Sequence, residues 1–409
     1  MLITRVNPAF LPYIVKKFTA IIRIKGFRET QIKFFQFQNI RRKNGILMAN
    51  NKIFVSAGDL SGDIHAANVI KEIKSINQNC QILALGGSNL KRVSDYFIED
   101  IVNINAFGLI SLKQILYFKK LLKKLNFIFS TQRPDKVILV DYYGFHIHVA
   151  RLAKKLNIPV FYYISPQVWA SRSSRINKLA KVVKKMLVIL PFEEALYRKN
   201  GIDAVFVGNP LIDKITQKNN FNQNAFDSSN PPLIGLFPGS RNWAIKRHIP
   251  ILLETAKILK EKINAKFIIF CANSNFCDLP EYIKVDSSGS FEQRKLIDFA
   301  ICPSGTVSLE NALMGIPMAI IYKLPYISYF FLRAIIKVKY ITMVNILSSK
   351  NVVSEFIQFN ANPKKISGCV LAQLDSKNYM PKVQELLLFR KMLGQIGVSK
   401  RVAEIILNA

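Results

Sequence analysis

Short apolar runs alternate with longer helix-like segments along most of the chain, and this alternation constrains the fold more than any other feature. Buried parallel strands read as short apolar runs, and each needs a crossover helix to reach its neighbour. A polar, Asn-rich stretch at 214–232 divides the runs into two series. The sequence therefore predicts an α/β fold with two Rossmann-like, doubly wound domains that face each other across a cleft. The expected strands are 52–57, 81–85, 136–141, 159–164, 185–190 and 204–207 in the first series, and 233–237, 266–271, 299–302 and 318–322 in the second.

The first 47 residues differ in composition from the remainder of the chain. They contain ten Lys or Arg residues and one acidic residue, Glu29, so they carry +9 of the formal net charge of +32. This basic, acid-poor extension is similar to an organellar transit peptide, but we favour a natural start at Met48, just before the first expected strand. We expect the extension over 1–47, a first domain over 48–214, a linker over 215–232 and a second domain over 233–409, with the option that the last helix returns to the first domain.

The positive net charge indicates which classes of molecule could bind this chain. The chain has 58 Lys and Arg residues against 26 Asp and Glu residues, so an anionic partner is expected unless the excess reflects biased genome composition. Nucleic acid, an anionic membrane surface and phosphorylated substrates all fit. The sequence has no zinc-finger spacing, no RRM signature and no basic-zipper heptads, and its basic residues are spread through ordinary helices. Charge alone therefore supports a nucleic-acid-binding protein only as an alternative.

Metal and disulfide chemistry find little support in the residue pattern. The chain has five scattered cysteines, an odd count that favours a reducing compartment without a disulfide framework. It has no Asp-x-Asp pair, which is the usual metal-holding motif of one large class of sugar transferases. His146 and His148 could share a strand face, but two histidines without a third ligand are more often structural. No apolar run reaches the length of about 18 residues that a transmembrane helix needs.

Three turns follow expected strands, at the end where open α/β sheets bind ligands. The turn at 57–63 contains glycines that permit close approach to a ligand, although such a turn is structural about as often. The turn at 238–241 combines a backbone nest, a hydroxyl and an arginine, which suits a diphosphate. The turn at 303–306 would cap a helix and face phosphate. Glu310, one turn into that helix, could accept hydrogen bonds from ribose hydroxyls or could be a surface charge.

Seven blocks of sequence, in a fixed order along the chain, resemble the lipid-A-disaccharide synthase family. A single block such as PGSR is weak evidence, whereas the ordered set, above all SPQVWASR together with LPFE, is specific. The resemblance covers about 50 to 400, nearly the whole chain after Met48. The blocks are AGDLSGD (57–63), ISPQVWASR (164–172), LPFEEALY (190–197), VGNPLID (207–213), FPGSR (237–241), SGTVSLENALMGIPMAIIYK (304–323) and NILSSKNVVSEFIQ (345–358).

The resemblance implies a GT-B glycosyltransferase of family 19. Such an enzyme joins UDP-2,3-diacylglucosamine to 2,3-diacylglucosamine 1-phosphate, forms the β-1′,6-linked disaccharide 1-phosphate and releases UDP. It implies an acceptor in the first domain, a UDP-sugar donor in the second and no metal or other cofactor. It also implies a cytoplasmic enzyme, peripheral on the inner face of the inner membrane, with an anionic membrane surface as partner and no nucleic acid. The oligomeric state stays open.

The resemblance, together with the needs of the chemistry, assigns roles to residues. An inverting transfer needs a base for the acceptor hydroxyl and charge stabilisation on the departing UDP. Asp141, at the carboxyl end of a buried strand, matches the first aspartate of a family motif and is the expected base, the alternative being a helix cap or a structural turn. Arg241 is expected at the leaving diphosphate. The donor site is expected to contain Gly239, Ser240, Arg241, Ser304, Gly305, Thr306, Glu310 and Asn345, and the acceptor side Gly58, Ser61, Gly62, Asp63, Trp169, Arg172 and Asn209.

Several positions depart from the family pattern. The family usually has Glu where this chain has Asp59, a second carboxylate where it has Gly144, and His where it has Asn209. A Glu is also common where Ala244 stands. These changes remove carboxylates or a histidine from site loops but leave Asp141, Arg241 and Glu310 in place. We interpret the chain as a divergent but active enzyme, with weakened activity or a shifted acceptor preference as the alternative.

An aromatic, basic stretch at 326–340 is the expected membrane contact. It reads equally as an interfacial helix or as a buried helix with a basic edge. The membrane-facing residues are expected to be Phe330, Phe331, Arg333 and Lys337. Among enzymes, the rival interpretation is another GT-B protein, such as a muramyl-pathway transferase or a UDP-N-acetylglucosamine 2-epimerase, and the SPQVWASR and LPFEEALY blocks argue against both.

Overall fold

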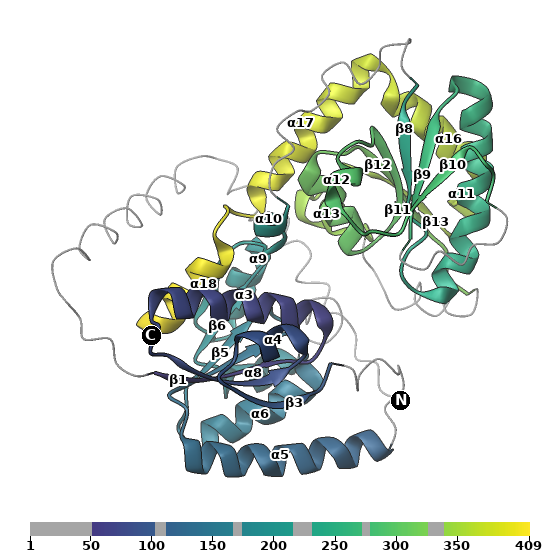
Figure 1. Cartoon of the computed structure of the whole chain (residues 1–409). Helices are drawn as coiled ribbons and strands as arrows, with labels where there is room; N and C mark the ends of the chain where they lie inside the picture. Colours follow the sequence, from purple (N-terminus) through teal and green to yellow (C-terminus); the bar gives the residue numbers. More distant parts are fainter. Residues whose placement is uncertain (1–50, 103–111, 167–173, 216–230, 272–278, 326–338) are drawn as a thin grey trace, which may run out of the picture. The chain divides into compact units, whose positions relative to one another are not determined.

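A computed structural model of the chain describes residues 51–102, 112–166, 174–215, 231–271, 279–325 and 339–409. The chain forms two α/β units (Figure 1). The first unit extends to Asp213 and includes Gln395–Ala409, and the second comprises Lys214–Gly394. Each unit contains one parallel sheet with interleaved helices, so the predicted α/β fold class is confirmed.

The first unit is built on a seven-stranded parallel sheet with the order β3-β2-β1-β4-β5-β6-β7. The chain winds outward from β1 to β3, then crosses back to place β4 on the other side of β1. The topological switch point therefore lies between β1 and β4. The strands are β1 (Lys52–Ala57), β2 (Gln81–Gly86), β3 (Tyr96–Asp100), β4 (Lys136–Val140), β5 (Val160–Tyr163), β6 (Lys185–Val188) and β7 (Ala204–Phe206).

Helices cover both faces of this sheet, and two apolar cores result. One core includes Phe54 and Tyr162 with side chains from α5 and α6, and the other includes Val55 and Tyr163 with side chains from α3. Alternate residues of one strand thus enter opposite cores, as strand geometry requires. The helices are α3 (Leu60–Ile76), α4 (Ser88–Val93), α5 (Leu112–Gln132), α6 (Tyr143–Lys155), α8 (Ser174–Ala180), α9 (Pro191–Lys199) and α10 (Leu211–Lys214).

The second unit repeats the design with a six-stranded parallel sheet, in the order β10-β9-β8-β11-β12-β13. Its switch point lies between β8 and β11. The strands are β8 (Leu233–Leu236), β9 (Lys266–Phe270), β10 (Ile283–Asp286), β11 (Phe299–Pro303), β12 (Met318–Tyr322) and β13 (Ser354–Ile357). The helices are α11 (Asn242–Ile263), α12 (Phe291–Arg294), α13 (Thr306–Met314), α15 (Met343–Ser348), η3 (Gln358–Asn360), α16 (Pro363–Leu374) and α17 (Ser376–Met392).

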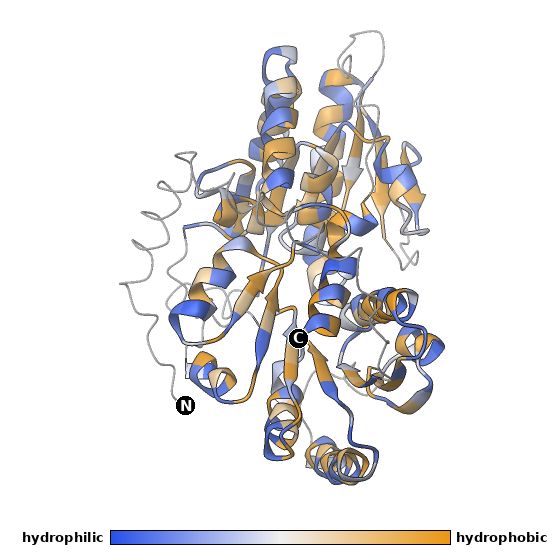
Figure 2. Cartoon of the chain, turned by 90° about the vertical axis from the view of Figure 1, so that its left-hand side faces the viewer, coloured by the Kyte–Doolittle hydropathy of each residue, from blue (hydrophilic) through white to orange (hydrophobic). Residues whose placement is uncertain are grey.

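Every strand predicted from the sequence is present, and the three strands that were missed within the described residues all lie at sheet edges. β3, β10 and β13 are edge strands, and none of them is a continuous buried run. An edge strand has a neighbour on one side only, so its sequence need not be uniformly apolar. The central strands are strongly hydrophobic, as the orange colour of most strands in Figure 2 shows.

The last helix, α18 (Val398–Asn408), belongs to the first unit, where it packs against α3. The Asp213 carboxylate accepts hydrogen bonds from the backbone N–H groups that open the helix, including those of Gly397 at 2.7 Å and Ser399 at 3.1 Å. At the other end, Lys136 Nζ donates to the Ile406 carbonyl at 2.7 Å. Opposite charges thus stabilise the two ends of the helix dipole.

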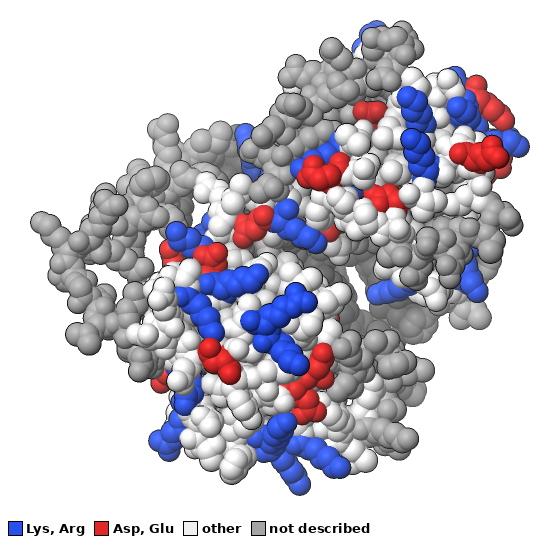
Figure 3. Space-filling model, viewed as in Figure 1, with Lys and Arg blue, Asp and Glu red and all other residues white. Residues whose placement is uncertain are grey.

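Among the described residues, no helix is both long and apolar enough to cross a membrane. Lys and Arg side chains are spread over both units in Figure 3. The N-terminal extension over 1–47, nearly all of the expected linker and the expected membrane-facing residues Phe330, Phe331, Arg333 and Lys337 lie outside the described residues.

Candidate functional site

Two carboxylates lie at the switch point of the first sheet. Ala57 and Val140 are register partners at the ends of β1 and β4. Asp59 and Asp141 follow these residues, so the topology brings them to the same edge of the sheet. Asp59 also begins α3, because its carboxylate accepts a hydrogen bond from Gly62 N–H at 2.7 Å. The sequence placed Asp141 in this position correctly but did not pair it with Asp59.

The electrostatics of Asp141 suit a group that takes up a proton near neutral pH. Burial and, second, the negative charge of Asp59 raise the pKa of Asp141 to about 6, against a smaller opposing effect of a hydrogen bond from the Tyr142 backbone N–H. A general base works best when its pKa lies near the working pH. Asp141 therefore combines the required position with the required basicity.

Gly58 is needed where it stands. A Cβ atom at this position would lie 2.2 Å from ring atoms of Tyr142, which follows Asp141 directly. Any side chain would displace that ring. The glycine thus permits the close approach of the β1 and β4 turns, and Ser61 is exposed on the same turn.

Two residues expected on the acceptor side are buried and hold neighbouring turns. Asp63 is fully buried and accepts hydrogen bonds from the N–H groups of Gly87 (2.7 Å) and Asn89 (2.9 Å), at the start of α4. Asn209 is buried and accepts from Leu211 N–H at 3.0 Å, which shapes the turn before α10. The side-chain oxygens of both residues accept from backbone N–H groups, and we therefore assign these oxygens to the scaffold.

At the switch point of the second sheet, two turns meet in the same way. Gly239 (φ +103°) follows β8, and Gly305 (φ +146°) follows β11. A Cβ atom at Gly239 would lie 3.6 Å from Pro303 Cγ, so the two turns are in contact. The first turn leads into α11 with Arg241 at its N-cap, and the second leads into α13. Two helix N-termini, each with N–H groups and a positive dipole end, form a cradle suited to a diphosphate.

The exposed residues of these turns, Ser240, Arg241 and Thr306, are accessible to a ligand. Arg241 makes no ion pair with any residue in the described parts of the chain. Ser304 is different, because its hydroxyl donates to the Ile341 carbonyl at 2.9 Å. Ser304 therefore links the β11 turn to the segment before α15.

Asn345, expected to lie near the nucleotide, is fully buried and holds the surrounding loop together. Its amide donates to the Val353 carbonyl (2.8 Å) and accepts from Val353 N–H (2.9 Å). Glu355, which the sequence interpretation missed, accepts from Asn345 Nδ2, from the Thr342 hydroxyl at 2.7 Å and from Ile341 N–H at 2.9 Å. We therefore assign Asn345 to the support of the Ser304 turn.

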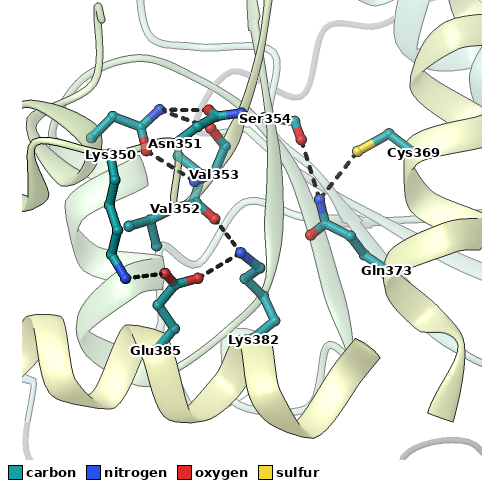
Figure 4. A network of polar contacts seen from close by, with 10 residues as sticks. Lys350, Asn351, Val352, Val353, Ser354, Cys369, Gln373, Lys382 and Glu385 are labelled. Carbon is teal, nitrogen blue, oxygen red and sulfur yellow. Dashed lines mark hydrogen bonds and ion pairs between the residues drawn. The ribbon is translucent and has the colours of Figure 1, made fainter. Parts of the chain in front are cut away.

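The same loop is held from outside by α17 (Figure 4). Lys382 Nζ donates to the Val352 carbonyl at 2.7 Å, and Glu385 pairs with both Lys350 and Lys382 at 2.6 Å. The two lysines lower the pKa of Glu385 despite its partial burial. The loop between α15 and β13 is thus held on two sides.

Glu310 is buried and forms an ion pair with Arg294, with 2.5 Å between Oε2 and Nη1. The guanidinium of Arg294 also lies over the rings of Phe237 (5.3 Å to the centroid) and Phe291 (5.1 Å). The alternative interpretation of Glu310 as a surface charge is therefore wrong, and its expected place at the donor stays a prediction. One of its oxygens is held by Arg294, a partner that the sequence interpretation did not identify.

His248, in α11, supports the turn that follows β8. It is buried, and its Nδ1 lies 2.9 Å from the Pro238 carbonyl, which can only accept. Nδ1 therefore carries the proton, and Nε2 accepts from Lys323 N–H at 3.3 Å. Burial lowers the pKa of His248, which keeps the ring neutral. A lone histidine in a helix gave no signal for this role in the sequence.

The remaining expected site residues, Trp169 and Arg172, lie outside the described residues. Within the parts of the chain that the structure describes, no three His, Cys, Asp or Glu side chains gather as a candidate metal site.

Comparison with known proteins identifies relatives along nearly the whole chain. A family model described as lipid-A-disaccharide synthetase matches residues 53–405. Lipid-A-disaccharide synthase 1 of Legionella pneumophila is 37% identical over 334 residues, covering 78% of this chain and 86% of the relative. The lipid-A-disaccharide synthase of Geobacter metallireducens is 33% identical over 376 residues, covering 88% and 97%.

Solved structures show the same fold at low identity. The UDP-GlcNAc 2-epimerase of Neisseria meningitidis, bound to UDP-GlcNAc, has a TM-score of 0.60 at 14% identity and covers 88% of this chain and all of that one. The UDP-GlcNAc 2-epimerase of Methanocaldococcus jannaschii has a TM-score of 0.58 at 15% identity, with coverage of 88% and 100%. Both share the GT-B fold, and at this level of identity the likeness shows the fold alone.

Proposed function

Because the chain belongs to the lipid-A-disaccharide synthase family, it is a glycosyltransferase that forms the lipid A disaccharide, and we propose that Asp141 is its general base. The observation that carries this assignment is the position of Asp141 at the switch point of the first sheet, where burial and Asp59 raise its pKa to about 6. The 2-epimerase and nucleic-acid alternatives are not favoured, because the synthase relatives match nearly the whole chain at much higher identity.

The substrates are lipid A precursor sugars, and the family implies UDP-2,3-diacylglucosamine as donor and 2,3-diacylglucosamine 1-phosphate as acceptor. Asp141 takes the proton of the acceptor 6-hydroxyl while that oxygen attacks the anomeric carbon of the donor. The bond between this carbon and the diphosphate oxygen breaks, and UDP departs with the electron pair. Attack on the face opposite the leaving group converts the α-linked donor into a β-linked product.

The second unit is proposed to stabilise the negative charge that develops on UDP. The supporting features are the helix N-termini of α11 and α13, the exposed Arg241 side chain and the contact between the Gly239 and Pro303 turns. Preorganised N–H groups and a guanidinium are suited to this task. Glu310, held by Arg294, is placed in the helix that leaves the second turn and is proposed to accept from the ribose. We propose that these groups act without a metal, in line with the lack of an Asp-x-Asp pair in the sequence.

The acceptor is an acylated sugar, so we propose that the enzyme works at the cytoplasmic surface of the inner membrane. The excess of basic residues would favour an anionic bilayer. Cosedimentation with anionic liposomes tests this, and a Phe330→Ser, Phe331→Ser variant is expected to bind more weakly. Equal binding by that variant and the wild type would contradict a membrane contact at these residues.

The decisive test is a transfer assay with the purified full-length protein and both acylated glucosamine substrates. Wild type is expected to form the disaccharide 1-phosphate, and Asp141→Asn is expected to lose roughly 10²- to 10⁴-fold in rate, the usual contribution of a general base. Asp203→Asn, at an exposed position paired with Lys185, is the control and is expected to be fully active. Undiminished turnover by Asp141→Asn would refute the base. If the wild type forms no product, the proposed function is refuted, whereas the description of the fold is unaffected.

A further inference from the structure

Asp141 has a backbone conformation that residues with a side chain rarely adopt. Its φ is +50°, and that of the next residue, Tyr142, is +47°. A left-handed conformation is sterically unfavourable at each non-glycine residue. Two in succession persist only where the surrounding structure compensates. Other groups must therefore hold Asp141 in place.

Two buried side chains donate to the Asp141 carbonyl. His146 Nδ1 lies 2.8 Å from this oxygen, and the Tyr162 hydroxyl donates to it at 2.5 Å. The Asp141 N–H donates in turn to the Tyr163 carbonyl at 3.0 Å. Both backbone polar groups of Asp141, the N–H and the carbonyl, are thus hydrogen-bonded. His146 and Tyr162 donate to the backbone carbonyl of Asp141 and not to its carboxylate.

The protonation of His146 follows from its partners. A backbone carbonyl can only accept, so Nδ1 carries the proton. In a neutral ring Nε2 is then an acceptor, and it lies 2.9 Å from the Ser56 hydroxyl. The ring is completely buried, and burial lowers the pKa of His146 to about 4. The imidazole is therefore neutral, in one tautomer, at physiological pH.

His146 connects the two strands that flank the switch point. Ser56 belongs to β1, and Asp141 follows β4, so the ring joins these elements through its two nitrogens. The ring also contacts Tyr142 edge-on, with 5.7 Å between centroids. A histidine that merely filled the core would not need both hydrogen bonds to lie on these two strands.

We propose that His146 is a positioning residue of the transfer reaction, which aims the Asp141 carboxylate by holding its carbonyl in the left-handed conformation. This inference rests on the proposed role of Asp141 as base. His146 does not touch the reacting atoms. It acts through the backbone, and Ser56 acts through His146 by selecting the tautomer that can donate.

The test compares variants that keep or remove the donor. His146→Asn retains an N–H at the position of Nδ1, whereas His146→Leu fills the space without one. A misplacement of about 1 Å costs roughly 100-fold in rate. We therefore expect His146→Leu to lose about 100-fold in kcat with KM for both substrates nearly unchanged, and His146→Asn to recover most of that loss.

The pH profile of kcat provides a second readout. The titratable groups around Asp141 are Asp59 and the hydroxyls of Tyr162 and Tyr197. His146→Leu is expected to shift the acidic limb of the profile, because the carboxylate leaves its buried position, and His146→Asn is expected to retain the wild-type limb. If His146→Leu does not fold, Tyr162→Phe removes the other donor to the same carbonyl. Its control is Tyr163→Phe, an equally buried neighbour whose hydroxyl has no hydrogen-bond partner among the described residues.

Each result decides between the two proposals. A His146→Leu variant within twofold of wild type in kcat, with Asp141→Asn inactive, would overturn the positioning role and leave the base intact. Equal losses in His146→Leu and His146→Asn, or in Tyr162→Phe and Tyr163→Phe, would also overturn it. If Asp141→Asn is fully active, the proposed base itself fails.

Discussion

Replacing Asp141 by Asn is expected to stabilise the protein at neutral pH while it removes the proposed base. The carboxyl of Asp141 has a pKa of 3.8 in its ordinary state and about 6 in the folded protein. A raised pKa means that the folded state favours the protonated form. The stability that this group contributes is therefore complete below pH 3.8 and is lost as the pH rises through 6.

The size of the effect follows from the shift. One pKa unit corresponds to 1.36 kcal/mol, so a shift of about two units corresponds to about 3 kcal/mol at pH 7.5 and to about half of that at pH 5. An uncharged Asn of the same shape avoids this cost. The free energy of unfolding of Asp141→Asn should thus exceed that of the wild type by up to this amount, and the gain should shrink toward acidic pH.

Urea unfolding, followed by circular dichroism at pH 7.5 and pH 5, measures this difference. Asp375→Asn is a matched control at an exposed helix N-cap, where Asn caps as well as Asp, so its change should stay within about 0.5 kcal/mol at both pH values. A variant at Asp141 that is no more stable than the wild type at pH 7.5, or whose gain grows toward pH 5, would refute the assigned burial and charge environment.

Three further predictions concern other contacts. Asp59→Asn keeps the helix cap but removes the charge, so the acidic limb of the activity profile should move to lower pH, and an unmoved limb would contradict coupling between the carboxylates. Arg294→Met should lower the free energy of unfolding by roughly 3–5 kcal/mol, because it leaves Glu310 buried and unpaired. Adding Glu310→Gln should restore part of the lost stability. An unchanged urea midpoint in the single variant would disprove the contribution of this ion pair. Ile406→Ala, on the buried face of α18, should lower the free energy of unfolding by roughly 2–5 kcal/mol. Ile396→Ala, at a residue that is 54% exposed, should lower it by less than about 0.5 kcal/mol. Similar losses in both variants would argue against the packing described.

The sequence allowed the central strands to be predicted because each is a nearly uniform apolar run between helices. The edge strands could not be found in this way. β10, for example, has a buried Ile283 followed by two exposed residues. An edge strand is specified by the neighbour with which it pairs, and that neighbour is distant in sequence.

The candidate site shows the same division between local and distant information. The positions of Asp141, Arg241 and the glycine turns were predictable because each follows a strand that is itself a clear apolar run. Glu355 and Arg294 were not, because each is defined by partners that the fold brings from other elements. His146 was interpreted as structural since no third metal ligand accompanies it, and only the contacts to Ser56 and Asp141 reveal another role.

The return of α18 to the first unit has a consequence for biosynthesis. Residues 398–408 leave the ribosome after the entire second unit, yet they complete the apolar core to which Ile70 and Ile73 of α3 belong. The second unit is one continuous segment and can fold during synthesis, whereas the nascent first unit must keep that face of α3 uncovered until residues 398–408 have been synthesised. The first unit is thus synthesised before the second unit but completes its core after it. Until α18 packs against α3, the first unit exposes an apolar surface that a chaperone would recognise.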